Sequence, residues 1–185
     1  MKKRRVVMLL AAVLLAAGLV SLRDAAMFYK GPVTDGSQEY YVNQFSRRAF
    51  AGSYVWDGEP DHMTIAIPEE AGGLPVTSLG GYTGRGVPVL FGVTLPEEYR
   101  STLTSQEGME VQEELVFTVE IGSSVRELTA VDMGYDTVGV RPGATVRYHV
   151  SYVYRCAPEN PTFYAADGVL YRRADNQPML PDPSS

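Results

Sequence analysis

The sequence has few of the residue types that most often carry chemistry. Its 185 residues include one cysteine, two histidines and one tryptophan. The single thiol, Cys156, can form neither an intrachain disulfide nor a multi-cysteine metal site, and we expect a small, partly buried hydrophobic residue there. The sequence also lacks the G-x-S-x-G and H-E-x-x-H motifs and a Cys–His pair in a catalytic context. We therefore predict a protein that is not an enzyme, with no catalytic residue, no metal site and no cofactor.

Positive charge is scarce outside the amino terminus. Four of the 16 lysines and arginines are residues 2–5, and no acidic residue precedes Asp24, so the rest of the chain has 12 basic and 22 acidic residues. Nucleic-acid phosphates and anionic lipid headgroups are both bound by clusters of Lys and Arg. The composition therefore argues against a nucleic-acid partner and against electrostatic docking on a membrane surface.

A long apolar run occurs at residues 6–22 (VVMLLAAVLLAAGLVSL), directly after Lys-Lys-Arg-Arg. A basic segment followed by an apolar one predicts an export signal. A helix over this run would be about 25 Å long, slightly short of a hydrocarbon core of about 30 Å, and basic flanking side chains such as Arg23 could reach the interface. Residues 1–22 are therefore predicted to be either an uncleaved membrane anchor or a signal peptide that is removed. Either way, the rest of the chain is expected to be extracytoplasmic.

Helical periodicity is scarce beyond residue 50, and the sequence predicts a mainly β domain over residues 39–180. Residues 23–38 contain Gly-Pro and Asp-Gly pairs and predict a tether with turns, and residues 39–50 fit a short helix or a strand entry. Asp57-Gly58 predicts a hairpin turn, and Asp167-Gly168 predicts a tight turn between two strands. The Pro- and Ser-rich residues 181–185 predict a disordered tail. Alternating apolar residues predict strands at 50–56, 62–67, 75–79, 87–95, 114–121, 125–131, 136–140, 145–154 and 162–171.

One strand pattern recurs, written apolar-x-x-apolar-x-apolar. Its copies start 28, 26 and 19 residues apart and occupy residues 62–67 (a weaker copy), 90–95, 116–121 and 135–140. This spacing brackets the 20–29-residue period of leucine-rich repeats. One such unit cannot bury its apolar face alone, and stacking the next unit on it does so. We therefore expect the strands around residues 65, 93 and 119 to stack in parallel.

These segments resemble the BspA-like class of bacterial surface leucine-rich repeats. The resemblance is carried by residues 68–80 (PEEAGGLPVTSLG), 90–96 (LFGVTLP), 122–128 (GSSVREL) and 160–180 (NPTFYAADGVLYRRADNQPML). The chain departs from the class at residues 81–86, where Gly-Tyr and Gly-Arg-Gly replace Ala-Phe and a Cys-x-x-Leu step. The resemblance implies a short, irregular leucine-rich-repeat-like β-solenoid with a protein-binding or adhesive role and no catalysis; a β-sandwich is the alternative.

The candidate binding residues are aromatic: Tyr148, Tyr152, Tyr154 and Trp56. The three tyrosines alternate with other residues along one predicted strand and so share a face. Tyrosine suits protein interfaces, although such a stripe is also typical of a packed core. If the stripe is exposed, the expected partner is another protein or a surface glycan.

Two polar groups support less favoured alternatives. His62 lies near Asp57, Glu59 and Asp61, but polar residues are expected in such a turn, which makes a metal site a weak interpretation. Glu97 or His62 would be the site residue of an unrecognised hydrolase. The sequence favours an extracytoplasmic binding module of a bacterial envelope, with a sugar-binding β-sandwich and a hydrolase as alternatives.

Overall fold

The structure of the chain is a computed structural model that describes residues 29–83, 86–100, 110–141 and 144–179. The predicted amino-terminal segment 1–22 and the tail 181–185 lie outside these residues. In the described part of the chain, no helix is long and apolar enough to cross a bilayer. Strands dominate, and the short helical pieces are single 3₁₀ turns, which confirms the predicted mainly β class.

The described elements follow one another in short steps. They are β1 (Lys30–Asp35), β2 (Gln38–Asn43), β3 (Arg48–Val55), η2 (Pro60–His62), β4 (Thr64–Ala66), β5 (Glu70–Ala71), β6 (Leu74–Leu79), β7 (Gly81–Tyr82), β8 (Pro88–Val89), β9 (Gly92–Thr94), η3 (Glu97–Tyr99), β10 (Glu110–Ile121), β11 (Glu127–Leu128), β12 (Tyr135–Arg141), β13 (Ala144–Cys156), β14 (Phe163–Ala166), β15 (Val169–Arg172) and β16 (Gln177–Pro178).

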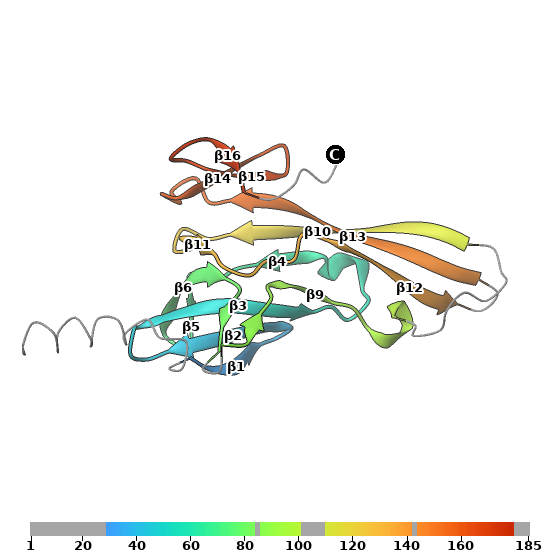
Figure 1. The fold of residues 1–185 in the computed structure, drawn as a ribbon, viewed down its shortest axis with the longest axis horizontal. Coiled ribbons are helices and arrows are strands. Elements are labelled where there is room, and N and C mark those ends of the chain that lie inside the picture. The colour runs from blue at the N-terminus through green and yellow to red at the C-terminus, as the bar shows by residue number, and fades with distance from the viewer. Residues whose placement is uncertain (1–28, 84–85, 101–109, 142–143, 180–185) are drawn as a thin grey trace, which may run out of the picture.

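Two sheets with parallel strands form the body of the molecule. The first sheet has the order β1-β2-β3-β6-β11, with β9 also beside β3, and the second has the order β12-β13-β10-β4. In the first sheet β6 and β9 are parallel to β3 and β11 is parallel to β6, whereas β1–β2 and β2–β3 are antiparallel pairs. In the second sheet β4 and β13 are parallel to β10, whereas β12 is antiparallel to β13. In Figure 1 the chain rises from β1–β3 at the bottom, through β4 and β10, to β13 and β14–β16 at the top.

The expected parallel stacking holds for two of the three strands. Ile65 of β4 is in register with Val119 of β10, which is in register with Tyr154 of β13. Val93 is not in this stack, because β9 lies in the first sheet opposite Tyr54. The partner of β3 changes from β6 to β9 within two residues, so β6 and β9 form one interrupted row, and the chain between them leaves the sheet.

The core lies between the inner faces of the two sheets. Along β10 the residues Leu115, Phe117, Val119 and Ile121 are buried and the residues between them are not, as the period of two of a strand requires. From the first sheet, Val76, Leu79 and Ala49 are fully buried in the same core cluster. The alternation in the sequence therefore identified the buried face of these strands.

Side chains in the turns join successive levels of the stack. The Glu69 carboxylate accepts a hydrogen bond from the backbone N–H of Ser123, and the Ser124 hydroxyl donates to the Val76 carbonyl at 2.8 Å. One level higher, the buried Asn160 amide donates to the carbonyls of Gly122 and Val125. Hydrogen bonds therefore join successive turns to one another, in addition to the backbone hydrogen bonds that join successive strands.

Two local predictions are corrected by the structure, and one open alternative is decided. Residues 30–35 of the expected tether form β1, which pairs with β2 through the turn at Gly36; all six β1 residues are exposed, so the strand has no apolar alternation to reveal it. For residues 39–50, where a short helix and a strand entry were both left open, the structure has most of β2, a turn at residues 44–47 and the start of β3. Asp57-Gly58 connects the two sheets instead of closing a hairpin, because β3 and β4 do not pair.

The predicted turn at Asp167-Gly168 is confirmed. Both residues have positive φ, +51° and +80°, and they join the antiparallel strands β14 and β15. Asp and Gly tolerate this backbone conformation, which tight hairpin turns need.

Candidate functional site

The four aromatic residues predicted to bind a partner are core residues. Tyr148, Tyr152, Tyr154 and Trp56 are each at most 5% exposed. The Tyr152 hydroxyl accepts the backbone N–H of Val93 at 3.0 Å, and the Trp56 indole N–H donates to the Glu59 carbonyl at 2.8 Å. Burial raises the pKa of the Tyr152 and Tyr154 phenols. The stripe faces the first sheet, so the glycan-binding alternative loses the residues on which it depended.

The two candidate hydrolase residues are not brought together. His62 contacts Asp57, with 2.7 Å between Nδ1 and Oδ2, and no hydrogen bond joins it to Glu97 of η3 among the described residues. The hydrogen bond between His62 and Asp57 raises the pKa of His62 and lowers the pKa of Asp57. His149 contacts Asp136 in the same way, with 2.7 Å between Nδ1 and Oδ1. Across the described ranges, no three His, Cys, Asp or Glu residues are grouped as metal ligands.

The hairpin between β6 and β9 lies in a segment with several exposed apolar side chains. It is formed by β7 and β8, with Gly81 opposite Val89 and Tyr82 opposite Pro88. It begins at Gly80, whose φ is +64° and whose α-carbon leaves no room for a side chain: an added Cβ would lie 1.8 Å from the carbonyl oxygen of Ala130. Large apolar side chains on this segment are accessible to solvent, at 45% for Tyr82, 53% for Val87 and 56% for Leu90.

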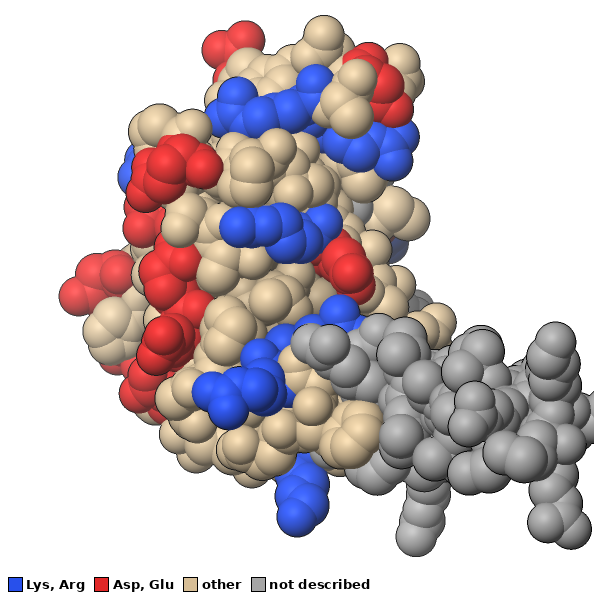
Figure 2. Space-filling view, turned by 90° about the vertical axis from the view of Figure 1, so that its left-hand side faces the viewer, with Lys and Arg blue, Asp and Glu red and all other residues tan. Residues whose placement is uncertain are grey.

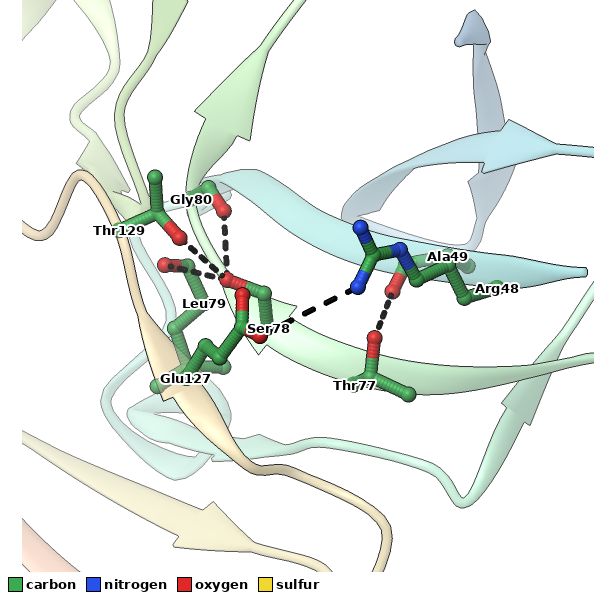
Figure 3. Close-up of polar contacts among 8 residues, drawn as sticks. All are labelled: Arg48, Ala49, Thr77, Ser78, Leu79, Gly80, Glu127 and Thr129. Carbon is green, nitrogen blue, oxygen red and sulfur yellow. Dashed lines mark hydrogen bonds and ion pairs between the residues drawn. The ribbon is translucent and has the colours of Figure 1, made fainter. Parts of the chain in front are cut away.

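A polar network fixes the base of the hairpin (Figure 3). The Ser78 hydroxyl lies 2.9 Å from both the Thr129 hydroxyl and the Gly80 carbonyl oxygen, and so links β6 to the segment after β11. At the neighbouring position the Arg48 guanidinium and the Glu127 carboxylate are 3.9 Å apart, across β6. The hydrogen-bond partners of the Ser78 hydroxyl are carbonyl oxygens and the Thr129 hydroxyl, not a general base that would activate it as a nucleophile. Ser78 therefore acts as a structural link.

A hollow lies between this network and the hairpin. Its walls include Tyr29, Arg48, Phe50, Ser78, Tyr82 and Thr129, and its volume is about 130 Å³. Burial raises the pKa of the Tyr29 phenol, and the Arg48 guanidinium partly offsets this effect. Pockets that enclose small molecules or cofactors usually measure about 300–1,000 Å³, so this hollow has room for a side chain rather than for a cofactor. We call the hollow together with exposed Tyr82, Val87 and Leu90 the hairpin surface.

Charge is unevenly spread over the side of the stack seen in Figure 2, which is the left-hand side of Figure 1. Acidic side chains gather along one margin, whereas Lys and Arg form separate tiers with uncharged surface between them. Nucleic-acid sites need a continuous basic band along the phosphate backbone. The face in this view has no such band.

Sequence reasoning missed the hairpin surface, although a signal for it was present. Gly80-Gly81-Tyr82 interrupts the strand pattern, and the chain departs from the BspA-like pattern over residues 81–86. Consecutive glycines before an aromatic residue indicate a sharp change of direction. The departure therefore coincides with the place where the hairpin leaves the sheet.

Comparison with known proteins assigns no family. The chain matches no protein-family model, no curated protein and no solved structure. The resemblance of residues 68–80 and 160–180 to BspA-like repeats therefore stays a prediction, and function has to be argued from the hairpin surface.

Proposed function

We propose that the chain is an extracytoplasmic binding module of a bacterial envelope that binds another protein through the hairpin surface. Residues 1–22 hold it at the membrane or are removed on export. The proposed role is non-enzymatic. The observation that carries the proposal is the exposure of Tyr82, Val87 and Leu90 on the one segment that leaves the strand row between β6 and β9.

The composition of the hairpin surface supports a protein partner. Loops positioned by a rigid sheet are frequent binding elements, and grouped exposed apolar side chains mark interaction sites. Tyr82 and Arg48, which both line the hollow, are residue types that dominate interface energetics. A hollow of about 130 Å³ fits one inserted side chain of a partner.

We propose the short leucine-rich-repeat-like β-solenoid as the finer architecture. It is supported by the parallel register of Ile65, Val119 and Tyr154 and by the side-chain bonds between successive turns. The β-sandwich alternative is supported by the two facing sheets. A solved structure of the whole chain would separate the two architectures. A solenoid requires successive turns of the chain that each place one strand in each sheet, whereas a sandwich does not.

Site-specific photocrosslinking tests the proposed function. Benzoylphenylalanine replaces Tyr82 in the full chain, expressed in the envelope of its own host, and replaces Val116 in a control. Val116 is 40% exposed on the outer face of β10, away from the hairpin. We expect a discrete protein adduct from position 82, absent from position 116, that Leu90→Ser reduces at least several-fold.

Two results would overturn the proposal. One is equal labelling of the same proteins from both positions, which indicates random collision. The other is an adduct at position 82 that neither Leu90→Ser nor Val87→Ser changes, in variants that keep the melting temperature of the parent protein.

A further inference from the structure

Strand β10 has an edge that is only partly paired. All twelve of its residues are in register with β13, but on the other side β4 pairs only with Thr118–Glu120. At the right of Figure 1, β10 is the uppermost of the three strands that extend past β4. Among the described residues, no strand pairs with residues 110–116 on that side. We call this stretch, EVQEELV, the open edge.

The open edge presents backbone groups with which a further strand could pair. In the paired part of β10, the backbone N–H of Thr118 donates to the Met63 carbonyl at 2.9 Å, on the side away from β13. This direction alternates from residue to residue along a strand, so Gln112, Glu114 and Val116 direct their N–H and C=O groups the same way. A row of such groups is a template on which a strand of a partner can add.

The open edge lacks most of the features that keep sheet edges from pairing. Its register with β13 is continuous, and its sequence contains neither proline nor glycine. The edge strand of the first sheet differs, because β1 contains Pro32, which has no N–H, and its register with β2 shifts between Lys30 and Val33. The ladder to β13 holds the open edge extended, so a partner would meet a preformed strand.

Charge decides which kind of strand suits the open edge. Residues 110–116 include three glutamates and no lysine or arginine. Antiparallel pairing of two copies about residue 112, 113 or 114 would place glutamates opposite each other, and like charges in that position destabilise a sheet. The side chains of Gln112 and Glu114 are exposed on the outer face, where a basic side chain of an added strand can reach them. The open edge therefore disfavours a second copy and favours a basic strand.

We propose that the open edge binds an extended basic segment of another protein, which adds to the second sheet beside β10. Main-chain hydrogen bonds to Gln112, Glu114 and Val116 supply the affinity, and the glutamates select lysine and arginine side chains. Val111 and Val116 are 39% and 40% exposed on opposite faces of β10, so both faces of the added segment have an apolar contact. This site goes beyond the hairpin surface, because it lies in the other sheet and recognises a partner through its main chain and charge.

Fluorescence anisotropy of labelled, capped peptides, titrated with the full chain in a neutral detergent, tests the proposal. The probes are Lys-Val-Lys-Val-Lys-Val-Lys, its counterpart with glutamate in place of lysine, and the lysine peptide with two adjacent central backbone nitrogens methylated. Methylation of adjacent nitrogens removes N–H groups from both edges of the peptide. We expect the lysine peptide to bind, the glutamate peptide to bind about tenfold more weakly, and the methylated peptide not to bind.

Three variants locate the binding site on β10. Gln112→Pro removes an N–H of the open edge and keeps the bonds to β13, and it should weaken binding of the lysine peptide about tenfold. Glu114→Gln should weaken it about threefold, and this variant decides the matter if Gln112→Pro lowers the melting temperature. The matched control is Glu120→Gln, which makes the same change on the same face of β10 where β4 already covers the edge, and binding should be unchanged.

Four results would overturn the proposal. They are equal binding of the methylated peptide, an equal loss in Glu120→Gln and Glu114→Gln, no binding of the lysine peptide at millimolar concentration, and a dimer of the parent chain in sedimentation velocity that Gln112→Pro dissociates. The last result would identify a second copy as the occupant. A strand bound at the open edge would label position 116 with a product different from the position-82 adduct, so this proposal and the hairpin surface fail separately.

Discussion

The side-chain amide of Asn160 donates a hydrogen bond of 2.7 Å to the backbone carbonyl of Gly122. The two residues belong to turns that follow neighbouring parallel strands, β13 and β10. The same amide donates to Val125, and its oxygen accepts the N–H groups of Thr162 and Phe163. One buried side chain thus orders its own turn and attaches it to the turn below.

Replacing Asn160 by alanine should remove these four bonds and leave buried backbone groups unpaired. We expect the free energy of unfolding to fall by about 3 kcal/mol, because each unsatisfied buried group costs about 1–3 kcal/mol and some will rebind water. Urea denaturation followed by fluorescence measures the change. Asn160→Asp keeps the acceptor but places a buried carboxylate oxygen against the Gly122 and Val125 carbonyls, so a loss at least as large is expected. A loss under 1 kcal/mol for Asn160→Ala would show that the turns are not coupled through this residue.

The start of the hairpin should tolerate no residue except glycine. Gly80→Ala combines a positive φ with a Cβ that would lie 1.8 Å from the Ala130 carbonyl oxygen, and we expect a loss above about 3 kcal/mol. Gly73→Ala is the matched control, since Gly73 has φ of +72° and open space around it. The control should lose about 1 kcal/mol, the conformational cost alone. Similar thermal shifts for the two variants would contradict the observed close approach.

The Tyr152 hydroxyl should matter for stability and the Tyr154 hydroxyl should not. Tyr152→Phe leaves the buried N–H of Val93 without its acceptor, which should cost about 1–3 kcal/mol. Tyr154 is equally buried, and its hydroxyl makes no hydrogen bond to the described residues, so Tyr154→Phe should be nearly neutral. Chemical denaturation of both variants provides the comparison. If the tyrosines formed an exposed binding stripe, both Tyr152→Phe and Tyr154→Phe would leave the free energy of unfolding nearly unchanged.

The contact between His62 and Asp57 should stabilise the fold in a limited pH range. Its hydrogen bond raises the pKa of His62 above 6.5, so the histidine contribution is complete below pH 6.5 and is lost as pH rises through the raised value. The same bond lowers the pKa of Asp57 below 3.8, so the aspartate contribution is present above pH 3.8 and is lost as pH falls through the lowered value. The stabilisation should therefore be greatest between pH 3.8 and 6.5.

The difference in unfolding free energy between the parent protein and Asp57→Asn, measured against pH, checks this window. We expect a small maximum inside it, because both side chains are exposed and solvent screens the pair. Asp61→Asn should give a nearly flat difference. A maximum above pH 7 would exclude the pair as its source.

The strands could be predicted from the sequence where apolar alternation was strong. Residues 114–121 and 145–154 lie within β10 and β13, and the Asp167-Gly168 turn is where it was expected. β1 was missed because none of its residues is buried, which leaves no pattern to detect. The hairpin was missed because its apolar residues are exposed, and Gly80-Gly81 before Tyr82 indicates a change of direction without specifying a hairpin.

Local pattern by itself determined the β class, the buried face of the strands and the acidic character of the chain beyond its amino terminus. Only the tertiary structure decided that Ile65 pairs with Val119 while Val93 pairs with Tyr54, and that Tyr152 faces the core instead of a partner. The physical reason is that side-chain alternation is a property of neighbouring residues, whereas strand partnership depends on segments far apart in the chain. An amphipathic tyrosine stripe fits a core and an interface equally well, and the first sheet packs against it.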